Sequence, residues 1–325
     1  MSSTSSYKQF AHLKIPLEEI QSATNNFSDA NIIRKDAFGY EYKGQLLRSG
    51  QLIDIVARRL DNKKGLGNKE FWMEVSLLCT SKHRNLVSIV GFCDESGEKM
   101  IINKHETRGS LYEYLGDPVL TWIRRLEIFV GVAKVLSYIY HDKGCDFSVI
   151  HSDIKSSKIL LDDEWEAKLS GFELSITQAA ARRNRLCLTD IRHTSEYSDP
   201  TYVMSGSLTH KSDVYSLAVI LFELLCGKDA VTIDADDRTS TPLAKTYHQE
   251  GRIDDMADPG LRKQMNPQSF RIFKETIYYC FQDQRSQRPN INQILIKLEK
   301  ALECQRKHEN PVRLLVSLSL SPSFL

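Results

Sequence analysis

The chain has 325 residues, 41% of them hydrophobic, which is enough apolar material for one large domain or two small ones. Its 43 Lys and Arg residues balance 42 Asp and Glu residues, which argues against a nucleic-acid partner held by a generally basic surface. Seven scattered cysteines without a C-x-x-C pair support neither a disulfide framework nor a zinc module, and no run approaches the roughly 20 apolar residues that span a bilayer.

The first predicted elements are a polar lead followed by strands. Residues 1–26 form the lead, in which Pro16 starts a short amphipathic helix. Strand-like runs follow at 39–47 and 52–60, and a helix is expected over about 68–81. The first third of the chain is therefore predicted to be rich in strands.

The second part of the chain has mainly helical patterns. Apolar residues from Leu126 to Tyr140 recur at helical spacing and predict a long helix that ends near His141. The run 212–226 is apolar almost all round, which is typical of a central helix, and 291–298 predicts a final amphipathic helix. A small strand-rich lobe before a larger helical lobe is thus predicted from pattern alone.

Two segments in the middle of the chain resemble protein-kinase motifs. The stretch from Val149 to Asp162 is similar to the catalytic loop, whose usual form is H-R-D-x-K-x-x-N-I-L-L-D, and Ala167 to Ser175 is similar to A-K-x-S-D-F-G-L-S. Further matches occur in the family order at 23–28, 38–44, 55–60, 70–74, 83–87, 199–202, 211–216 and 288–289. Together they resemble the plant receptor-like kinases, in the branch whose receptors carry malectin-like ectodomains.

The resemblance implies an α+β, bilobal protein-kinase-like fold. It has a small β-rich N-lobe with one key helix and a larger helical C-lobe. The expected boundaries are 1–26 for the lead segment, 27–304 for the kinase-like domain, with the N-lobe at about 27–107 and the C-lobe at about 108–304, and 305–325 for a tail.

The nucleotide-binding positions implied by the resemblance are degenerate. In the family loop G-x-G-x-F-G the glycines let the backbone approach the phosphates, and this chain keeps only Gly39, with Arg34 and Asp36 at the other two positions. Glu41 replaces the valine that roofs the adenine slot, where a buried carboxylate costs several kcal/mol unless it is paired or protonated.

Four further positions belong to this degenerate nucleotide site. Arg58 occupies the place of the nucleotide lysine, and we expect it to pair with Glu74 as a structural clasp more than as a phosphate clamp. By the same alignment Lys104 falls at the gatekeeper, and Leu160 matches the floor of the adenine slot.

The catalytic positions are mixed. Asp153 keeps the aspartate that orients the substrate hydroxyl, and Lys155 keeps the lysine two residues on. Lys158 and Gly171 stand at the family's two metal-ligand positions, so a cation and a hydrogen replace two oxygen ligands and no metal site is expected. Asp153 is therefore weighed both as a working base and as a remnant that organises its loop.

Three more departures concern regulation and packing. Ser152 replaces the arginine of H-R-D, and Glu173 replaces the glycine of D-F-G. Thr201 replaces a glutamate that usually pairs with the arginine at position 288, so another acid, a water cluster or local disorder must compensate for the charge of Arg288.

The scaffold positions match the family. His151, Phe172 and Leu78 correspond to stacked positions of its regulatory spine. Asp213 is expected to cap amides of the catalytic loop, and Thr194 to reach toward Asp153.

Three functions remain open from the sequence. The preferred one is a receptor-like pseudokinase that docks onto active receptor-like kinases or other signalling proteins, without nucleic acid and without direct membrane insertion. The second is a weakly active ATP-dependent serine/threonine kinase. ATP binding is expected to be weak, magnesium binding is not expected, and the expected location is the cytoplasm, with recruitment to the plasma membrane through a receptor partner.

A third function is that of a substrate or decoy phosphorylated by other kinases. The segment expected to be phosphorylated is the activation segment. It is basic, with Arg182, Arg183 and Arg185, and rich in residues that can accept phosphate: Thr189, Thr194, Ser195 and Tyr197. A plain solvated loop explains the same residues.

Overall fold

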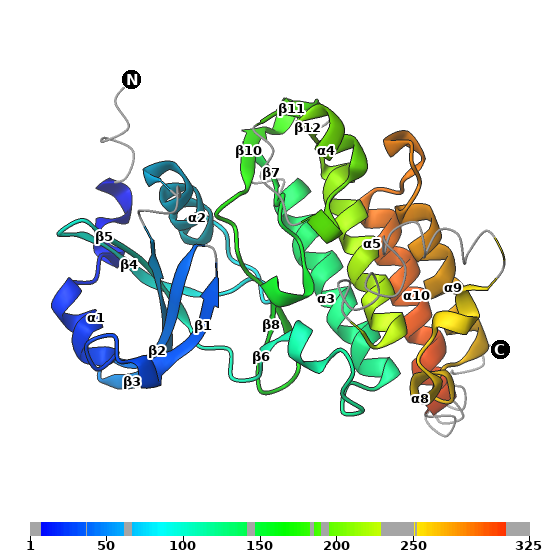
Figure 1. Cartoon of the computed structure of the whole chain (residues 1–325), viewed down its shortest axis with the longest axis horizontal. Coiled ribbons are helices and arrows are strands. Elements are labelled where there is room, and N and C mark those ends of the chain that lie inside the picture. The colour runs from blue at the N-terminus through cyan, green and yellow to red at the C-terminus, as the bar shows by residue number, and fades with distance from the viewer. Residues whose placement is uncertain are drawn as a thin grey trace, which may run out of the picture.

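A computed structural model of the chain has two lobes, which lie side by side in Figure 1. The structure describes residues 8–36, 38–61, 67–141, 147–182, 185–189, 195–228, 250 and 252–309. The predicted bilobal α+β fold is confirmed.

The N-lobe is an antiparallel sheet of five strands in the order β1-β2-β3-β5-β4, with the helix α2 packed beside it (Figure 1). Its elements are β1 (Ile32–Asp36), β2 (Gly39–Arg48), β3 (Gln51–Leu60), α2 (Asn68–Thr80), β4 (Ile89–Glu95) and β5 (Glu98–Lys104). The predicted strands at 39–47 and 52–60 and the predicted helix at 68–81 are therefore confirmed. The Glu70 carboxylate accepts a hydrogen bond from the Gly67 amide at 2.9 Å, which fixes the start of α2.

A segment before the sheet covers one of its faces. It consists of a 3-10 helix, Lys8–Leu13, and α1, Leu17–Ala23. Ile15 and Ile20 are 2% and 0% exposed and pack with Ile55 and other residues of the sheet. From residue 8 onward the predicted lead segment thus packs on the sheet of the N-lobe, and its boundary at residue 26 stays a prediction.

The approach of this segment to the sheet is close. The Ile15 amide donates to the Phe92 carbonyl of β4 at 2.8 Å. A Cβ atom on Gly91 would lie 2.4 Å from the Leu13 carbonyl oxygen, so only glycine fits at that position.

The C-lobe is built on four long helices with small sheets at the side that faces the N-lobe (Figure 1). Its helices are α3 (Trp122–His141), α4 (Pro200–Ser205), α5 (His210–Cys226), α8 (Pro259–Arg262), α9 (Pro267–Cys280) and α10 (Ile291–Glu309). Its strands are β6 (Gly109–Ser110), β7 (Phe147–Ile150), β8 (Ile159–Leu161), β9 (Ala167–Leu169), β10 (Ile176–Ala179), β11 (Cys187–Leu188) and β12 (Ser207–Leu208). The predicted long helix, central helix and final helix are confirmed as α3, α5 and α10.

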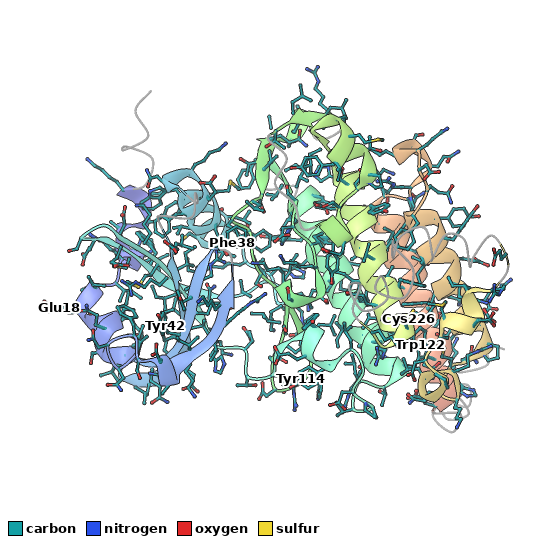
Figure 2. All side chains as sticks on the ribbon, viewed as in Figure 1. Glu18, Phe38, Tyr42, Tyr114, Trp122 and Cys226 are labelled. Atoms are coloured by element: carbon teal, nitrogen blue, oxygen red, sulfur yellow. The ribbon has the colours of Figure 1, made fainter. Side chains whose placement is uncertain are left out.

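The hydrophobic core of the described residues has two larger clusters and a small third cluster, which holds Ile150, Tyr202 and Leu208. A large cluster joins α2 to the C-lobe helices, and a second cluster lies under α1. Figure 2 shows Trp122 and Cys226 within the C-lobe and Phe38 at the edge of the N-lobe that faces the C-lobe. The last helix, α10, continues to Glu309, beyond the expected domain boundary at 304, and that boundary stays a prediction. The rest of the predicted tail lies outside the described residues.

Two expectations from composition can be checked in the described part of the chain. Its six cysteines are free thiols, as expected, while Cys145 lies outside it. None of its helices combines the length and the apolar character that crossing a bilayer requires.

Candidate functional site

The candidate site lies between the lobes, where Arg58 on β3 faces Glu74 on α2. The Arg58 guanidinium donates to both carboxylate oxygens of Glu74, at 3.3 Å from Nη1 and 2.8 Å from Nη2. The two side chains are 7% and 1% exposed. The predicted ion pair is therefore confirmed.

A second buried ion pair joins this one. Lys158 Nζ donates to Glu173 Oε1 at 2.8 Å, and Glu173 Oε2 lies 3.3 Å from Nη2 of Arg58. Lys158 and Glu173 are 2% and 1% exposed. Arg58, Glu74, Lys158 and Glu173 thus form one cluster of two cations and two anions, which we call the cleft cluster.

The cleft cluster controls the ionisation of its members. Burial alone would raise the pKa of Glu173, but Arg58 and Lys158 outweigh burial and hold this pKa well below its ordinary value. Burial alone would lower the pKa of Lys158, but the attraction of Glu173 raises it overall. Both groups are therefore charged at neutral pH.

Gly171 leaves the space through which the Lys158 side chain runs. A Cβ atom on residue 171 would lie 2.4 Å from Cδ and 2.8 Å from Cε of Lys158, and φ at Gly171 is +80°. The two positions that hold a metal in the family are thus filled by one lysine side chain. An ammonium group and a glycine do not fit Mg²⁺, which needs oxygen ligands, and the described residues contain no group of three acidic, His or Cys side chains suited to a metal.

The catalytic loop has the expected scaffold. Asp213 accepts from the amides of His151 and Ser152 at 2.8 and 2.9 Å, so its predicted capping role is confirmed. The rings of His151 and Phe172 lie 4.6 Å apart, as the stacked positions predict. Thr194 lies outside the described residues.

The two retained catalytic residues contact each other. Lys155 Nζ lies 3.1 Å from Asp153 Oδ2, and the Asp153 side chain is 3% exposed. Asp153 is thus held in a buried ion pair on its own loop, and its role as a base stays a prediction.

A row of alternating charges crosses the strands above the cleft cluster. In strand register Glu41 lies opposite both Arg34 and Arg58, so these three side chains share one face of the sheet. Glu41 is half-buried, and Gly39 lies at the start of β2. The cost expected for Glu41 is therefore reduced by two cationic neighbours.

The strand register places Lys104 at the end of β5. Arg58 points toward the cleft, and Val56 shares its face because side chains alternate along a strand. Asn103 lies opposite Val56, whereas Lys104 lies opposite Ile55 and is exposed at the end of β5. Asn103 therefore shares the face of Val56 and Arg58, and the place of Lys104 at the gatekeeper stays a prediction.

Leu160 lies in the middle of β8, opposite Ser110 of β6, and is half-buried. Its predicted place as the floor of an adenine slot stays a prediction.

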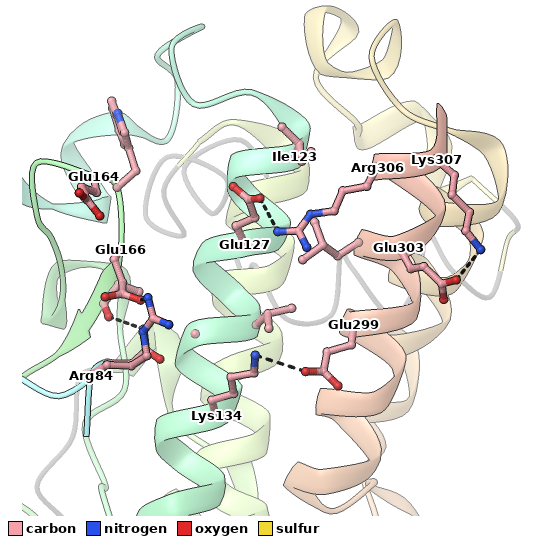
Figure 3. Close-up of a pocket in the computed structure, with 16 residues that line it drawn as sticks. Arg84, Ile123, Glu127, Lys134, Glu164, Glu166, Glu299, Glu303, Arg306 and Lys307 are labelled. Carbon is pink, nitrogen blue, oxygen red and sulfur yellow. Dashed lines mark hydrogen bonds and ion pairs between the residues drawn. The ribbon is translucent and has the colours of Figure 1, made fainter. Parts of the chain in front are cut away.

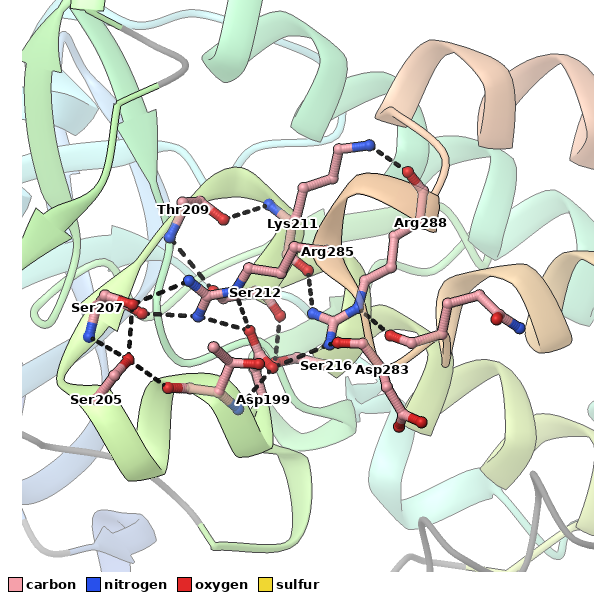
Figure 4. A network of polar contacts seen from close by, with 12 residues as sticks. Asp199, Ser205, Ser207, Thr209, Lys211, Ser212, Ser216, Asp283, Arg285 and Arg288 are labelled. Atoms are coloured by element: carbon pink, nitrogen blue, oxygen red, sulfur yellow. Dashed lines mark hydrogen bonds and ion pairs between the residues drawn. The ribbon is translucent and has the colours of Figure 1, made fainter.

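The buried Arg288 pairs with Asp199 in place of the glutamate that Thr201 replaces. Its Nη2 donates to Asp199 Oδ1 at 3.0 Å, and Arg285 approaches the other Asp199 oxygen at 2.7 Å (Figure 4). Burial alone would raise the pKa of Asp199, but these guanidiniums hold it below its ordinary value. Of the three compensations that the sequence left open, the structure has another acid, Asp199.

A broad hollow of about 1120 Å³ lies elsewhere, between α3, α10 and the turn before β9. Its charged side chains pair with one another, as in Lys134 with Glu299 at 3.4 Å and Arg306 with Glu127 at 2.8 Å (Figure 3). It does not contain the predicted catalytic residues, so the cleft between the lobes remains the candidate site.

Residues 29–298 match the sequence model of the family described as protein tyrosine and serine/threonine kinase. The chain belongs to this protein-kinase family.

Among curated proteins of Arabidopsis thaliana, the chain is similar to three receptor-like protein kinases. It is 35% identical to ANXUR2 over 308 residues, 34% identical to FERONIA over 296 residues and 36% identical to HERK 1 over 300 residues. The alignments cover 92%, 90% and 91% of this chain but 35%, 32% and 35% of those proteins. The predicted resemblance to plant receptor-like kinases is confirmed, and the chain spans about a third of the length of these relatives.

Proposed function

We propose that this protein is a receptor-like pseudokinase, a kinase domain that does not transfer phosphate and acts as a protein-interaction module in kinase signalling. The observation that carries the proposal is the contact between Lys158 and Glu173 at the place of the family's metal ligands. An ammonium group repels a divalent cation, and Gly171 supplies no oxygen. Phosphoryl transfer depends on metal ions to neutralise the phosphates, so we expect at most trace activity.

The charges around the cleft also argue against a bound nucleotide. The side chains concerned are Arg34, Arg58, Lys155 and Lys158 on one side and Glu41, Glu74, Asp153 and Glu173 on the other. Four positive charges meet four negative ones, so these residues offer a polyanion no excess of positive charge. ATP binding is therefore proposed to be weak.

The scaffold supports a role in binding proteins. The capped catalytic loop, the buried Arg58–Glu74 pair and the large core keep the shape of a kinase without its metal chemistry. We propose as partners active receptor-like kinases or other signalling proteins, which would bring this domain to the cytoplasmic side of the plasma membrane.

A weakly active serine/threonine kinase is the second candidate. It is favoured by Asp153 and Lys155, which keep their places in the loop, and by the retained pair of Arg58 with Glu74. Such an enzyme needs an arrangement of metal ligands other than the family's.

Transfer of labelled γ-phosphate distinguishes the two candidates. The purified chain is incubated with ATP, Mg²⁺ or Mn²⁺ and a general acceptor protein, beside the Asp153→Asn variant. Loss of one well-placed electrostatic group costs about 10²–10³ in rate, so with both metal positions changed we expect equal background labelling in the two samples. Labelling by the wild type that Asp153→Asn abolishes would refute the pseudokinase and support the weak kinase.

A further inference from the structure

The cleft cluster joins the two lobes. Arg58 and Glu74 belong to the N-lobe, while Lys158 precedes β8 and Glu173 follows β9 in the C-lobe. Glu173 contacts cations of both lobes, Lys158 at 2.8 Å and Arg58 at 3.3 Å. The Glu173 carboxylate is therefore one point of contact between the lobes, in addition to the apolar cluster that joins α2 to the C-lobe.

The charges of the cleft cluster interact strongly because they are buried. The four side chains are between 1% and 7% exposed, so water screens their charges little. Removing one partner of such a buried pair is strongly destabilising, because it leaves a charge without compensation. Removing the Glu173 carboxylate thus costs far more than removing one partner of an exposed ion pair.

Two further contacts across the cleft surround the cluster. Arg34 Nη1 of β1 donates to the Ser157 carbonyl at 2.9 Å, next to Lys158. Lys158 Nζ lies 5.5 Å from the centre of the Phe38 ring, within the range of a cation–π contact. Both contacts hold the edge formed by β1 and β2 against the turn that carries Lys158.

We infer that Arg58, Lys158 and Glu173 form an interlobe latch, which holds the two lobes closed and α2 against the C-lobe without nucleotide or metal. The latch deepens the proposed function, since a domain held in one arrangement presents one fixed surface to a partner protein. The Lys158 ammonium contacts the Glu173 carboxylate, and this carboxylate also contacts Arg58 of the N-lobe.

The Glu173→Gln variant tests the latch. We expect its melting temperature to fall by about 5–10 °C. We also expect amide exchange in 39–48 and in 156–161 to become at least about tenfold faster, because the contact between these two sides is lost. The matched control is Glu303→Gln, which removes an exposed carboxylate that contacts Lys300 and Lys307, and we expect it to change the melting temperature by less than about 1 °C.

A double variant, Lys158→Met with Glu173→Gln, separates a latch from a pair that serves stability alone. It leaves Arg58 paired with Glu74 and no buried charge uncompensated, so we expect its melting temperature to recover relative to Glu173→Gln. A latch predicts that amide exchange in 39–48 and 156–161 stays fast in the double variant. Exchange at the wild-type rate in both ranges overturns the latch, and it does so even if Glu173→Gln alone fails to fold. Neither result depends on phosphate transfer, which tests the proposed function separately.

Discussion

At the scale of single residues, Lys158, Gly171 and Glu173 depend on one another. The Lys158 side chain runs through the space that any side chain on residue 171 would occupy, and Glu173 compensates its charge. Lys158 would clash with any side chain at residue 171, and Lys158 or Glu173 without the other would lack a partner for its buried charge.

Gly171→Ala is predicted to destabilise the protein by about 2–4 kcal/mol, from a positive φ together with overpacking against Lys158. The matched control is Gly50→Ala, whose φ is +78° but whose added Cβ meets nothing within 4 Å. It is expected to cost only about 1–2 kcal/mol. Both values come from denaturant unfolding, and equal losses in the two variants would contradict the close packing of Lys158.

Part of the site was predictable at this scale. Arg58 and Glu74 stand at positions that pair throughout the resembling motifs, so their ion pair could be predicted from sequence. The bond from Lys158 to Glu173 could not, because a glutamate 15 residues away has no fixed direction until the loops fold. The only indication in the sequence was that Lys158 and Glu173, which both depart from the family motif, carry opposite charges. Likewise, the sequence could not pair Asp199 with Arg288, because the two residues are far apart in the chain and meet only in the folded C-lobe.

At the scale of elements, hydrophobic patterning predicted the strands at 39–47 and 52–60 and the helices now seen as α2, α3, α5 and α10. The central helix α5 is buried on all sides, whereas the others alternate buried and exposed positions. The register of β5 was harder. Counting along the chain from the motif before β5 and from the motif after it places a given family position on two residues that differ by one. A shift of one residue moves a side chain to the opposite face of the sheet. Pairing of Asn103 with Val56 decides the register.

The segment before the sheet is the element whose role the sequence understated. Ile15 and Ile20 fill the face of the sheet that α2 leaves open, although the family match starts only at residue 29. A domain cut at that start would expose this apolar face to water.

Ile20→Ala is therefore predicted to destabilise the protein by about 2–5 kcal/mol, as for a side chain in a packed core. Ser22→Ala, on the exposed side of the same helix, is the control and is expected to change stability by less than about 0.5 kcal/mol. Chemical denaturation followed by tryptophan fluorescence measures both. A loss below 1 kcal/mol for Ile20→Ala would show that α1 is not an integral part of the N-lobe.

At the scale of the whole molecule, the net charge of +1 conceals how charges are arranged. In the cleft, cations and anions neutralise one another through contacts that reach across both lobes. The four buried charges of the cleft cluster are thus balanced within the chain.

The central claim, that Lys158 and Gly171 leave no magnesium site, is tested most directly by melting curves with ATP in the presence and absence of Mg²⁺. A ligand at a hundredfold excess over its Kd stabilises a protein by about 2.7 kcal/mol, so binding of a magnesium–nucleotide complex is readily seen. The wild type is predicted to melt at the same temperature with and without Mg²⁺, whereas a variant carrying Lys158→Asn, Gly171→Asp and Glu173→Gly is predicted to gain a shift that depends on Mg²⁺. A Mg²⁺-dependent rise in the melting temperature of the wild type would contradict the account.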